Sequence, residues 1–128
     1  MAPLPFVPGR HAIEAYGGGG FRFAGMSHVG SILATPRGVS AVAAASIAEV
    51  GDEALARLFS ELEVAPGAVE LLVVGAGASP ARLSEALVQR LRASGLRFEA
   101  MATGPAARMY NVLVDEGRRV AALLIAVA

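Results

Sequence analysis

An almost uninterrupted apolar run, Val-Glu-Leu-Leu-Val-Val-Gly, occupies residues 69–75. Runs of this kind are typical of a central strand that is covered on both faces. The chain after it predicts a helix over residues 79–94, with Ser79 as its N-cap and Pro80 at its first helical position, and then a strand over residues 96–101. This order predicts a βαβ unit, in which the two strands are parallel and the crossover is right-handed.

The last part of the chain predicts one more helix and one more strand. Thr103 is placed to cap the helix, Pro105 falls in its first turn, and Gly117 ends it after about Glu116. The apolar run that begins with Arg118–Arg119 predicts the final strand, with the two arginine side chains on its opposite faces. Spacing alone leaves the direction of this strand open.

Strand patterns dominate the first part of the chain. Ile13 and its neighbours predict one strand, and Phe21 and Phe23 alternate with a polar residue as in a half-buried second strand. The glycines at positions 17–20 predict a tight hairpin between these strands. Two further strands are expected on either side of a turn at residues 36–38.

The middle of the chain completes the predicted architecture. A helix is expected with Asp52 as its N-cap, and its buried stripe would consist of Leu55, Leu58, Phe59 and Leu62. Three prolines among the first eight residues predict a flexible arm over residues 1–10. Residues 11–128 are expected to form a single three-layer α/β domain. Its central mixed β-sheet would be flanked by helices, with an additional antiparallel N-terminal β layer.

The composition excludes several classes of function. Cysteine is absent, so disulfides, thiolate catalysis and cysteine-type zinc sites are excluded. The net charge is zero and no basic stripe is visible, so nucleic-acid binding is not expected. The longest strongly apolar run, residues 120–128, is far shorter than the roughly 20 residues of a membrane helix, and the start lacks a secretory signal. We therefore expect no membrane insertion and a cytoplasmic location.

One glycine-rich turn is the best candidate for a ligand site. Gly75-Ala76-Gly77 follows an apolar strand and precedes a predicted helix, where backbone N–H groups favour an anion. Because Pro80 stands where a dinucleotide-binding fingerprint has its third glycine, the pattern favours a glycine-rich turn over a nucleotide site. If a small molecule or an anion binds, the candidate residues are Gly75, Gly77, Ser79, Thr103, Arg108 and Arg118.

The sequence predicts no catalytic residue, no metal site and no cofactor. His11 and Glu14 are three residues apart on an expected strand, so their side chains would point to opposite faces, and His28 stands alone. The Gly-x-Ser-x-Gly pattern of a nucleophile elbow is also absent. A non-enzymatic role is favoured, and enzymatic activity stays an open question at this point.

Tyr110 and Asn111 form a polar pair in the last predicted helix. The helical phase places Tyr110 on the apolar face, so we expect a buried ring whose hydroxyl finds a partner. Asn111 falls at the border of that face and is expected to bind the backbone of a neighbouring loop, either the turn after Gly75 or the turn at Gly117. The alternative is a ligand-facing polar pair.

Three segments, residues 16–36, 70–77 and 101–125, together resemble a known family of small α/β proteins. This domain-of-unknown-function family includes a mitochondrial assembly factor for respiratory complex I (NADH:ubiquinone oxidoreductase), and bacteria carry short stand-alone versions. The resemblance implies a central mixed sheet with helices and a separate β layer. It implies no catalytic residue; its matches, at residues 75, 77, 103, 110, 111 and 118, mark a signature.

Three hypotheses for the function follow. The first is a non-enzymatic protein-interaction or assembly factor with a protein partner, which the resemblance links to biogenesis of a respiratory or membrane complex. The surplus of apolar residues, 55% of the chain, agrees with this hypothesis because it can leave apolar surface for a partner. The second is a small-molecule or anion-binding domain with a pocket near Gly75–Ser79. The third is a structural homo-oligomer that is joined through an apolar face.

Overall fold

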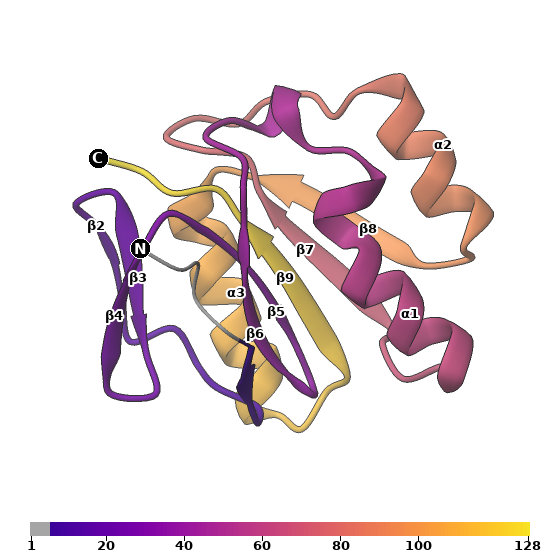
Figure 1. Cartoon of the computed structure of the whole chain (residues 1–128), viewed down its shortest axis with the longest axis horizontal. Coiled ribbons are helices and arrows are strands. Elements are labelled where there is room, and N and C mark those ends of the chain that lie inside the picture. Colours follow the sequence, from indigo (N-terminus) through magenta and orange to yellow (C-terminus); the bar gives the residue numbers. More distant parts are fainter. Residues whose placement is uncertain (1–5) are drawn as a thin grey trace.

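The computed structural model describes residues 6–128 and contains two β-sheets and three α-helices in this range (Figure 1). The larger sheet has six strands in the order β1-β6-β5-β9-β7-β8, and the smaller sheet has three in the order β2-β3-β4. The strands of the larger sheet are β1 (Val7–Pro8), β5 (Ser31–Thr35), β6 (Gly38–Val42), β7 (Leu71–Gly75), β8 (Arg97–Met101) and β9 (Val120–Leu124). Those of the smaller sheet are β2 (Ala15–Gly17), β3 (Gly20–Phe23) and β4 (Met26–Val29).

The larger sheet is mixed, and its parallel and antiparallel halves meet at β9. Strand β7 is parallel to both β8 and β9, whereas β5 is antiparallel to both β9 and β6. The parallel pairing of β7 with β8 that the apolar run predicted is therefore confirmed. The direction of the last strand, which spacing left open, is parallel to β7.

The helices lie on both faces of the larger sheet (Figure 1). Two 3-10 turns, Ile47–Glu49 and Asp52–Leu55, precede α1 (Ala56–Val64), and α1 and α2 (Glu85–Ala93) cover one face. Helix α3 (Thr103–Asp115) covers β7 and β9 on the opposite face, and the smaller sheet packs on that same face beside it. This arrangement confirms the predicted α/β class with its mixed central sheet, flanking helices and antiparallel N-terminal β layer.

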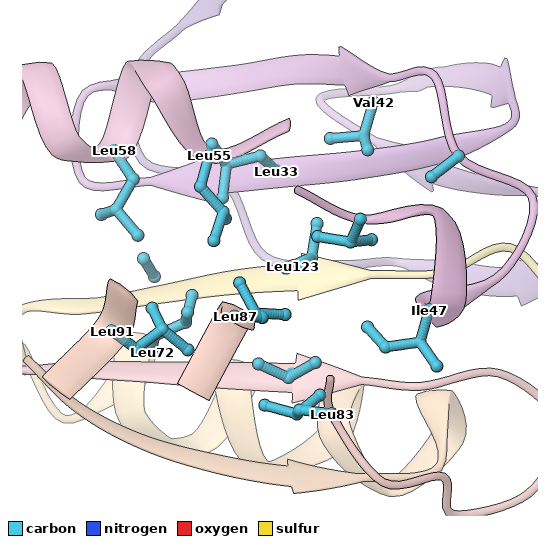
Figure 2. Close-up of a cluster of buried hydrophobic side chains, with 14 of the residues drawn as sticks. Leu33, Val42, Ile47, Leu55, Leu58, Leu72, Leu83, Leu87, Leu91 and Leu123 are labelled. Atoms are coloured by element: carbon cyan, nitrogen blue, oxygen red, sulfur yellow. The ribbon is translucent and has the colours of Figure 1, made fainter. Parts of the chain in front are cut away.

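Each face of the larger sheet has its own hydrophobic core, because alternate residues of a strand point to opposite faces. Figure 2 shows the core under α1 and α2, where Leu72 and Leu123 of the sheet meet Leu58 of α1 and Leu87 of α2. The core on the opposite face contains the fully buried side chains Phe23, Ile32, Val73, Tyr110 and Leu124.

Three predicted helix caps are wrong. Helix α2 begins at Glu85, and its N-cap is Ser84, whose hydroxyl accepts a hydrogen bond from Leu87 N at 3.1 Å. The segment from Ser79 to Ser84 is instead part of a loop. Gly51 rather than Asp52 precedes the second 3-10 turn, Asp52–Leu55, and Ala102 rather than Thr103 is the N-cap of α3. The two predicted capping side chains have other partners. Asp52 pairs with Arg90 at 3.6 Å, and the Thr103 hydroxyl binds two backbone groups that are distant in sequence.

The N-terminal part also differs from the prediction in two places. Val7 and Pro8 pair with β6, so this portion of the expected arm is part of the sheet, and residues 1–5 lie outside the described range. The strand expected around Ile13 begins at Ala15, and a strand that was not predicted, β4, completes the smaller sheet. The hairpin between β2 and β3 is confirmed, and it turns at Gly18-Gly19.

Candidate functional site

The carboxyl end of β7 meets the beginning of α3 at Gly75. A Cβ atom on Gly75 would lie 2.9 Å from both Leu124 Cδ2 and Thr103 Cα, so a larger residue would force these elements apart. Thr103 Oγ1 accepts a hydrogen bond from Gly77 N at 3.0 Å and donates one to Ile125 O at 2.7 Å. Three of the six candidate ligand residues, Gly75, Gly77 and Thr103, are therefore together, and their contacts join β7, α3 and the chain after β9.

The backbone donors of this turn are already used inside the protein. Ala76 N donates to Met101 O at 2.7 Å, and Gly77 N donates to the Thr103 hydroxyl. Thr103 N, at the beginning of α3, donates to Gly77 O at 2.8 Å. An anion cradle needs N–H groups that point to the ligand without a protein acceptor. The observed bonds instead give the turn a structural role.

The structure does not bring Arg118 to this turn. Leu71 pairs with Val120 and Gly75 pairs with Leu124, so Arg118 lies beside the beginning of β7 and the turn lies at its end. A single pocket that contains both Arg118 and Gly75 is therefore not formed.

Arg118 and Arg119 both bind Glu70, the residue before β7. Arg118 Nη2 lies 2.5 Å from Glu70 Oε1, and Arg119 Nη2 lies 3.5 Å from Glu70 Oε2. The hydrogen bond from Arg118 lowers the pKa of the Glu70 carboxyl, and the charges of the two guanidinium groups lower it further. Because both arginines precede β9 and reach the same carboxylate, the expectation that they occupy opposite faces of a strand is wrong.

The two remaining candidates also lie apart from the turn's hydrogen-bond network. Ser79 is exposed in the loop between β7 and α2. Arg108 Nη1 donates a hydrogen bond to the Tyr16 hydroxyl at 3.1 Å, which connects α3 to β2 of the smaller sheet.

Tyr110 and Asn111 hold the segment before β2 against α3. The Tyr110 ring is fully buried, and its hydroxyl donates to His11 O at 3.0 Å. Asn111 Oδ1 accepts from Ile13 N at 2.7 Å, and Asn111 Nδ2 donates to Ile13 O at 2.8 Å. The expectation that Asn111 binds the turn after Gly75 or the turn at Gly117 is wrong, because its partner is the backbone of Ile13. Burial raises the pKa of Tyr110 to about 12.

Gly117 occupies the position after the end of α3. Its φ of +77° is in the left-handed region, and its N–H donates to Val114 O at 3.0 Å. The bond from Arg118 N to Leu113 O, at 2.9 Å, completes the helix end. Gly117 therefore turns the chain from α3 into β9.

A groove of about 1040 Å³ lies between β6 and α1, and the sequence prediction missed it. Its lining includes Ser40 and Ala41 of β6, Arg57 and Glu61 of α1, and Phe6 from the segment before β1. Glu61 is only 8% exposed. One signal was available in the sequence, because Glu61 follows Leu58 by three residues and thus shares the side of the helix that is otherwise apolar.

A model of the family described as a protein of unknown function, DUF498/DUF598, matches residues 13–125 of the chain. The chain belongs to this family. An uncharacterised protein of Rhodobacter capsulatus is 41% identical over 98% of the chain and 93% of its own length. Membership of the DUF498/DUF598 family confirms the resemblance that the three segments indicated.

A more distant relative has a functional name. The NADH dehydrogenase [ubiquinone] 1 alpha subcomplex assembly factor 3 of Xenopus tropicalis is 33% identical over 88% of the chain, and the match spans 60% of that protein. Among solved structures, an outer membrane protein from Bartonella henselae is 40% identical, with a TM-score of 0.86 over 95% of this chain and 99% of that chain. Within residues 6–128, none of the helices has the length and apolar character needed to cross a membrane.

Proposed function

We propose that the chain is a non-enzymatic interaction or assembly factor that binds a protein partner during biogenesis of a respiratory or membrane complex. The observation that carries the proposal is the 33% identity, over 88% of the chain, to a relative named as an assembly factor of NADH dehydrogenase. The chain spans 60% of that relative, so the proposal concerns the part that the two proteins share.

The contacts of the polar residues support this proposal. The residues that the sequence offered for ligand chemistry bind other parts of the chain: Thr103 and Gly77 bind each other, Arg118 binds Glu70, and Arg108 binds Tyr16. Several large apolar side chains, in contrast, are exposed on the surface, where they are available to a partner. They are Tyr16, Met26, Val29, Val64 and Val112.

Capture from native cells tests the proposal. The tagged chain, expressed at its natural level, is purified under mild conditions, and the proteins that accompany it are quantified by mass spectrometry against a tag-only control. We expect a stoichiometric partner among the subunits or assembly proteins of a membrane complex. If light scattering finds only a homo-oligomer and repeated captures return no stoichiometric partner, the proposal is wrong and the structural alternative replaces it.

A further inference from the structure

Strand β8 forms an open edge of the larger sheet. Among residues 6–128, its hydrogen-bonded neighbour is β7 alone, and in Figure 2 it is the lowest strand. Arg97, Glu99 and Ala100 of this strand are exposed, and Phe98 is half-buried. The unpaired N–H and C=O groups of such an edge form a template to which another strand can be added.

The segment that precedes the described residues is too short to cover this edge. Residues 1–5 come before β1, which lies at the opposite edge of the sheet, and five interstrand spacings separate β1 from β8. This separation is about 24 Å, whereas five extended residues span about 18 Å at most. A strand that pairs with β8 therefore comes from another molecule.

The backbone groups on the open side of β8 are those of Phe98 and Ala100. Met101 O accepts a hydrogen bond from Ala76 N at 2.7 Å, so the backbone groups of Met101 point toward β7. Successive residues of a strand direct their N–H and C=O groups alternately to its two sides. Phe98 and Ala100 therefore direct these groups away from β7 and toward the open edge.

Two opposite charges lie beside these backbone groups on one face of β8. Arg97 and Glu99 are two residues apart, so their side chains share a face, and the pairing of Glu99 with Val73 places them on the α3 side of the sheet. Neither side chain has an ion pair among residues 6–128, and residues 1–5 contain no charged side chain. Both charges are therefore available to a strand that pairs with β8.

Antiparallel pairing of β8 with a second copy of itself has one register that joins these charges. The outward backbone groups of the two copies must face each other, so the two-fold axis passes through Arg97, Phe98 or Glu99. An axis at Arg97 or at Glu99 places like charges opposite each other, which is unfavourable. An axis at Phe98 places Arg97 of each copy opposite Glu99 of the other. This pair is not hydrogen-bonded through the backbone, so its side chains approach closely.

We infer that the chain forms a symmetric dimer through β8, with the two-fold axis at Phe98 and an Arg97–Glu99 ion pair on each side of it. The edge is self-complementary, as a two-fold interface requires, and this property favours a second copy over an unrelated strand. The dimer is reversible and weak, because five residues of strand edge bury less area than a stable interface does. The inference goes beyond the proposed function and does not depend on it.

Concentration-dependent measurements on the wild type test the dimer. Sedimentation equilibrium from the micromolar to the millimolar range should show a monomer that converts to a dimer. Over the same range, hydrogen exchange followed by NMR should slow at the N–H groups of Phe98 and Ala100, because both gain acceptors. The control is the N–H of Val29, which points away from β3 on β4, the edge strand of the smaller sheet, and should exchange at one rate throughout.

Charge exchange tests the register. Arg97→Glu places two carboxylates opposite each other on both sides of the axis, and Glu99→Arg places two guanidinium groups there, so each variant should raise the dissociation constant of the dimer about tenfold or more. The double variant restores opposite charges and should return the constant to near the wild-type value. Arg37→Glu makes the same charge change at an exposed turn between β5 and β6 and should leave the constant unchanged.

Ala100→Pro tests the backbone pairing. Proline removes an N–H that points to the open edge, so no bond to β7 is lost, but it prevents the addition of a strand. The variant should melt like the wild type at a concentration at which both are monomeric, and it should not dimerise. If the variant melts at a lower temperature, the charge-exchange series decides, because its substitutions are at exposed positions.

Four outcomes would overturn the inference. The chain could remain monomeric up to millimolar concentration, or dimerise without slower exchange at Phe98 and Ala100. The double variant could dimerise as weakly as the single variants, which would exclude the register. A native partner could slow exchange at the same two N–H groups of a chain that is monomeric alone, and the edge would then bind a strand of that partner. The assembly proposal depends only on capture of a native partner, so either proposal can fail while the other stands.

Discussion

The Asn111 side chain forms hydrogen bonds with both the N–H and the C=O of Ile13, as the backbone of a neighbouring strand would. Substitution of Asn111 by alanine leaves both groups without a partner, which should lower the free energy of unfolding by about 1–3 kcal/mol. The melting temperature should fall by about 2–8 °C for each kcal/mol. Val112→Ala is the matched control, because its side chain is 56% exposed, and it should melt like the wild type. Equal melting of Asn111→Ala and the wild type would contradict this structural role.

The neighbouring residue, Tyr110, should make stability depend on alkaline pH. Its pKa is about 12 in the folded protein, against about 10 in an unfolded chain. The folded state therefore holds the proton more tightly, so this contribution is complete below pH 10 and is lost as the pH rises toward 12. The loss reaches about 3 kcal/mol, since one pKa unit corresponds to about 1.4 kcal/mol.

Comparison of the wild type with Tyr110→Phe isolates this effect. At neutral pH the variant should be less stable by about 0.5–1.5 kcal/mol, because the hydrogen bond to His11 O is lost. Between pH 10 and 12 the wild type should lose more stability than the variant, and the order should reverse. Urea denaturation at a series of pH values measures both differences. Parallel pH curves for the two proteins would show that burial does not hold the Tyr110 proton.

The backbone donors around Gly75 lead to a prediction about anions. Ala76 N and Gly77 N already have acceptors within the chain, so phosphate at millimolar concentration should not raise the melting temperature above that in chloride of equal ionic strength. Thr103→Val frees Gly77 N and serves as the comparison. A rise in the wild type as large as that in Thr103→Val would restore the anion-binding hypothesis.

At the scale of elements, the sequence predicted what depends on apolar patterns and missed what depends on distant partners. The run at residues 69–75 identified β7 and its parallel neighbour, because a strand that is buried on both faces needs a continuous apolar sequence. Ser79 and Ser84 are equally good local capping residues, and only tertiary packing places the helix start after Ser84. Thr103 looked like a cap because its partners, Gly77 and Ile125, are 26 and 22 residues away.

The groove could not be predicted for the same reason. Its two walls, β6 and α1, are joined by about a dozen residues of loop and short helical turns, and no local pattern fixes their separation. Glu61 was visible only as a polar residue near an apolar stripe, and the partner of its Oε2, the Thr35 hydroxyl, is 26 residues away in the sequence. Helical phase predicted that Tyr110 is buried and that Asn111 binds backbone groups. It could not predict that the backbone they bind is that of the segment before β2.

The two serines before α2 provide a direct test at the element scale. Ser84→Ala removes the acceptor for Leu87 N, and loss of an N-cap costs about 0.5–2 kcal/mol. Ser79→Ala, in an exposed loop position, should leave the free energy of unfolding unchanged within about 0.5 kcal/mol. Urea denaturation of both variants decides the assignment, and a larger effect at Ser79 would mean that α2 begins earlier than the structure shows.

The whole molecule is organised by one sheet with a hydrophobic core on each face. Neighbouring residues of β7 serve the two cores, because Leu72 packs under α1 and α2 while Val73 packs under α3. Both side chains are fully buried. Every strand of the parallel half contributes to both cores. Loss of one layer would therefore expose apolar side chains of the same strands that form the core under the other layer. We therefore expect residues 11–128 to unfold as one cooperative unit.

Substitutions on either side of β7 test this expectation. Leu72→Ala should cost about 2–5 kcal/mol, and Val73→Ala less, since it removes fewer side-chain carbon atoms. Tyrosine fluorescence, from Tyr110 of α3 and Tyr16 of β2, reports on the α3 side of the sheet, and far-ultraviolet circular dichroism reports on all elements. If the domain is a single unit, Leu72→Ala shifts the fluorescence transition as far as the dichroism transition, although Leu72 is on the opposite face from Tyr110. A fluorescence midpoint that stays at the wild-type value while the dichroism midpoint falls would mean that the two layers unfold independently.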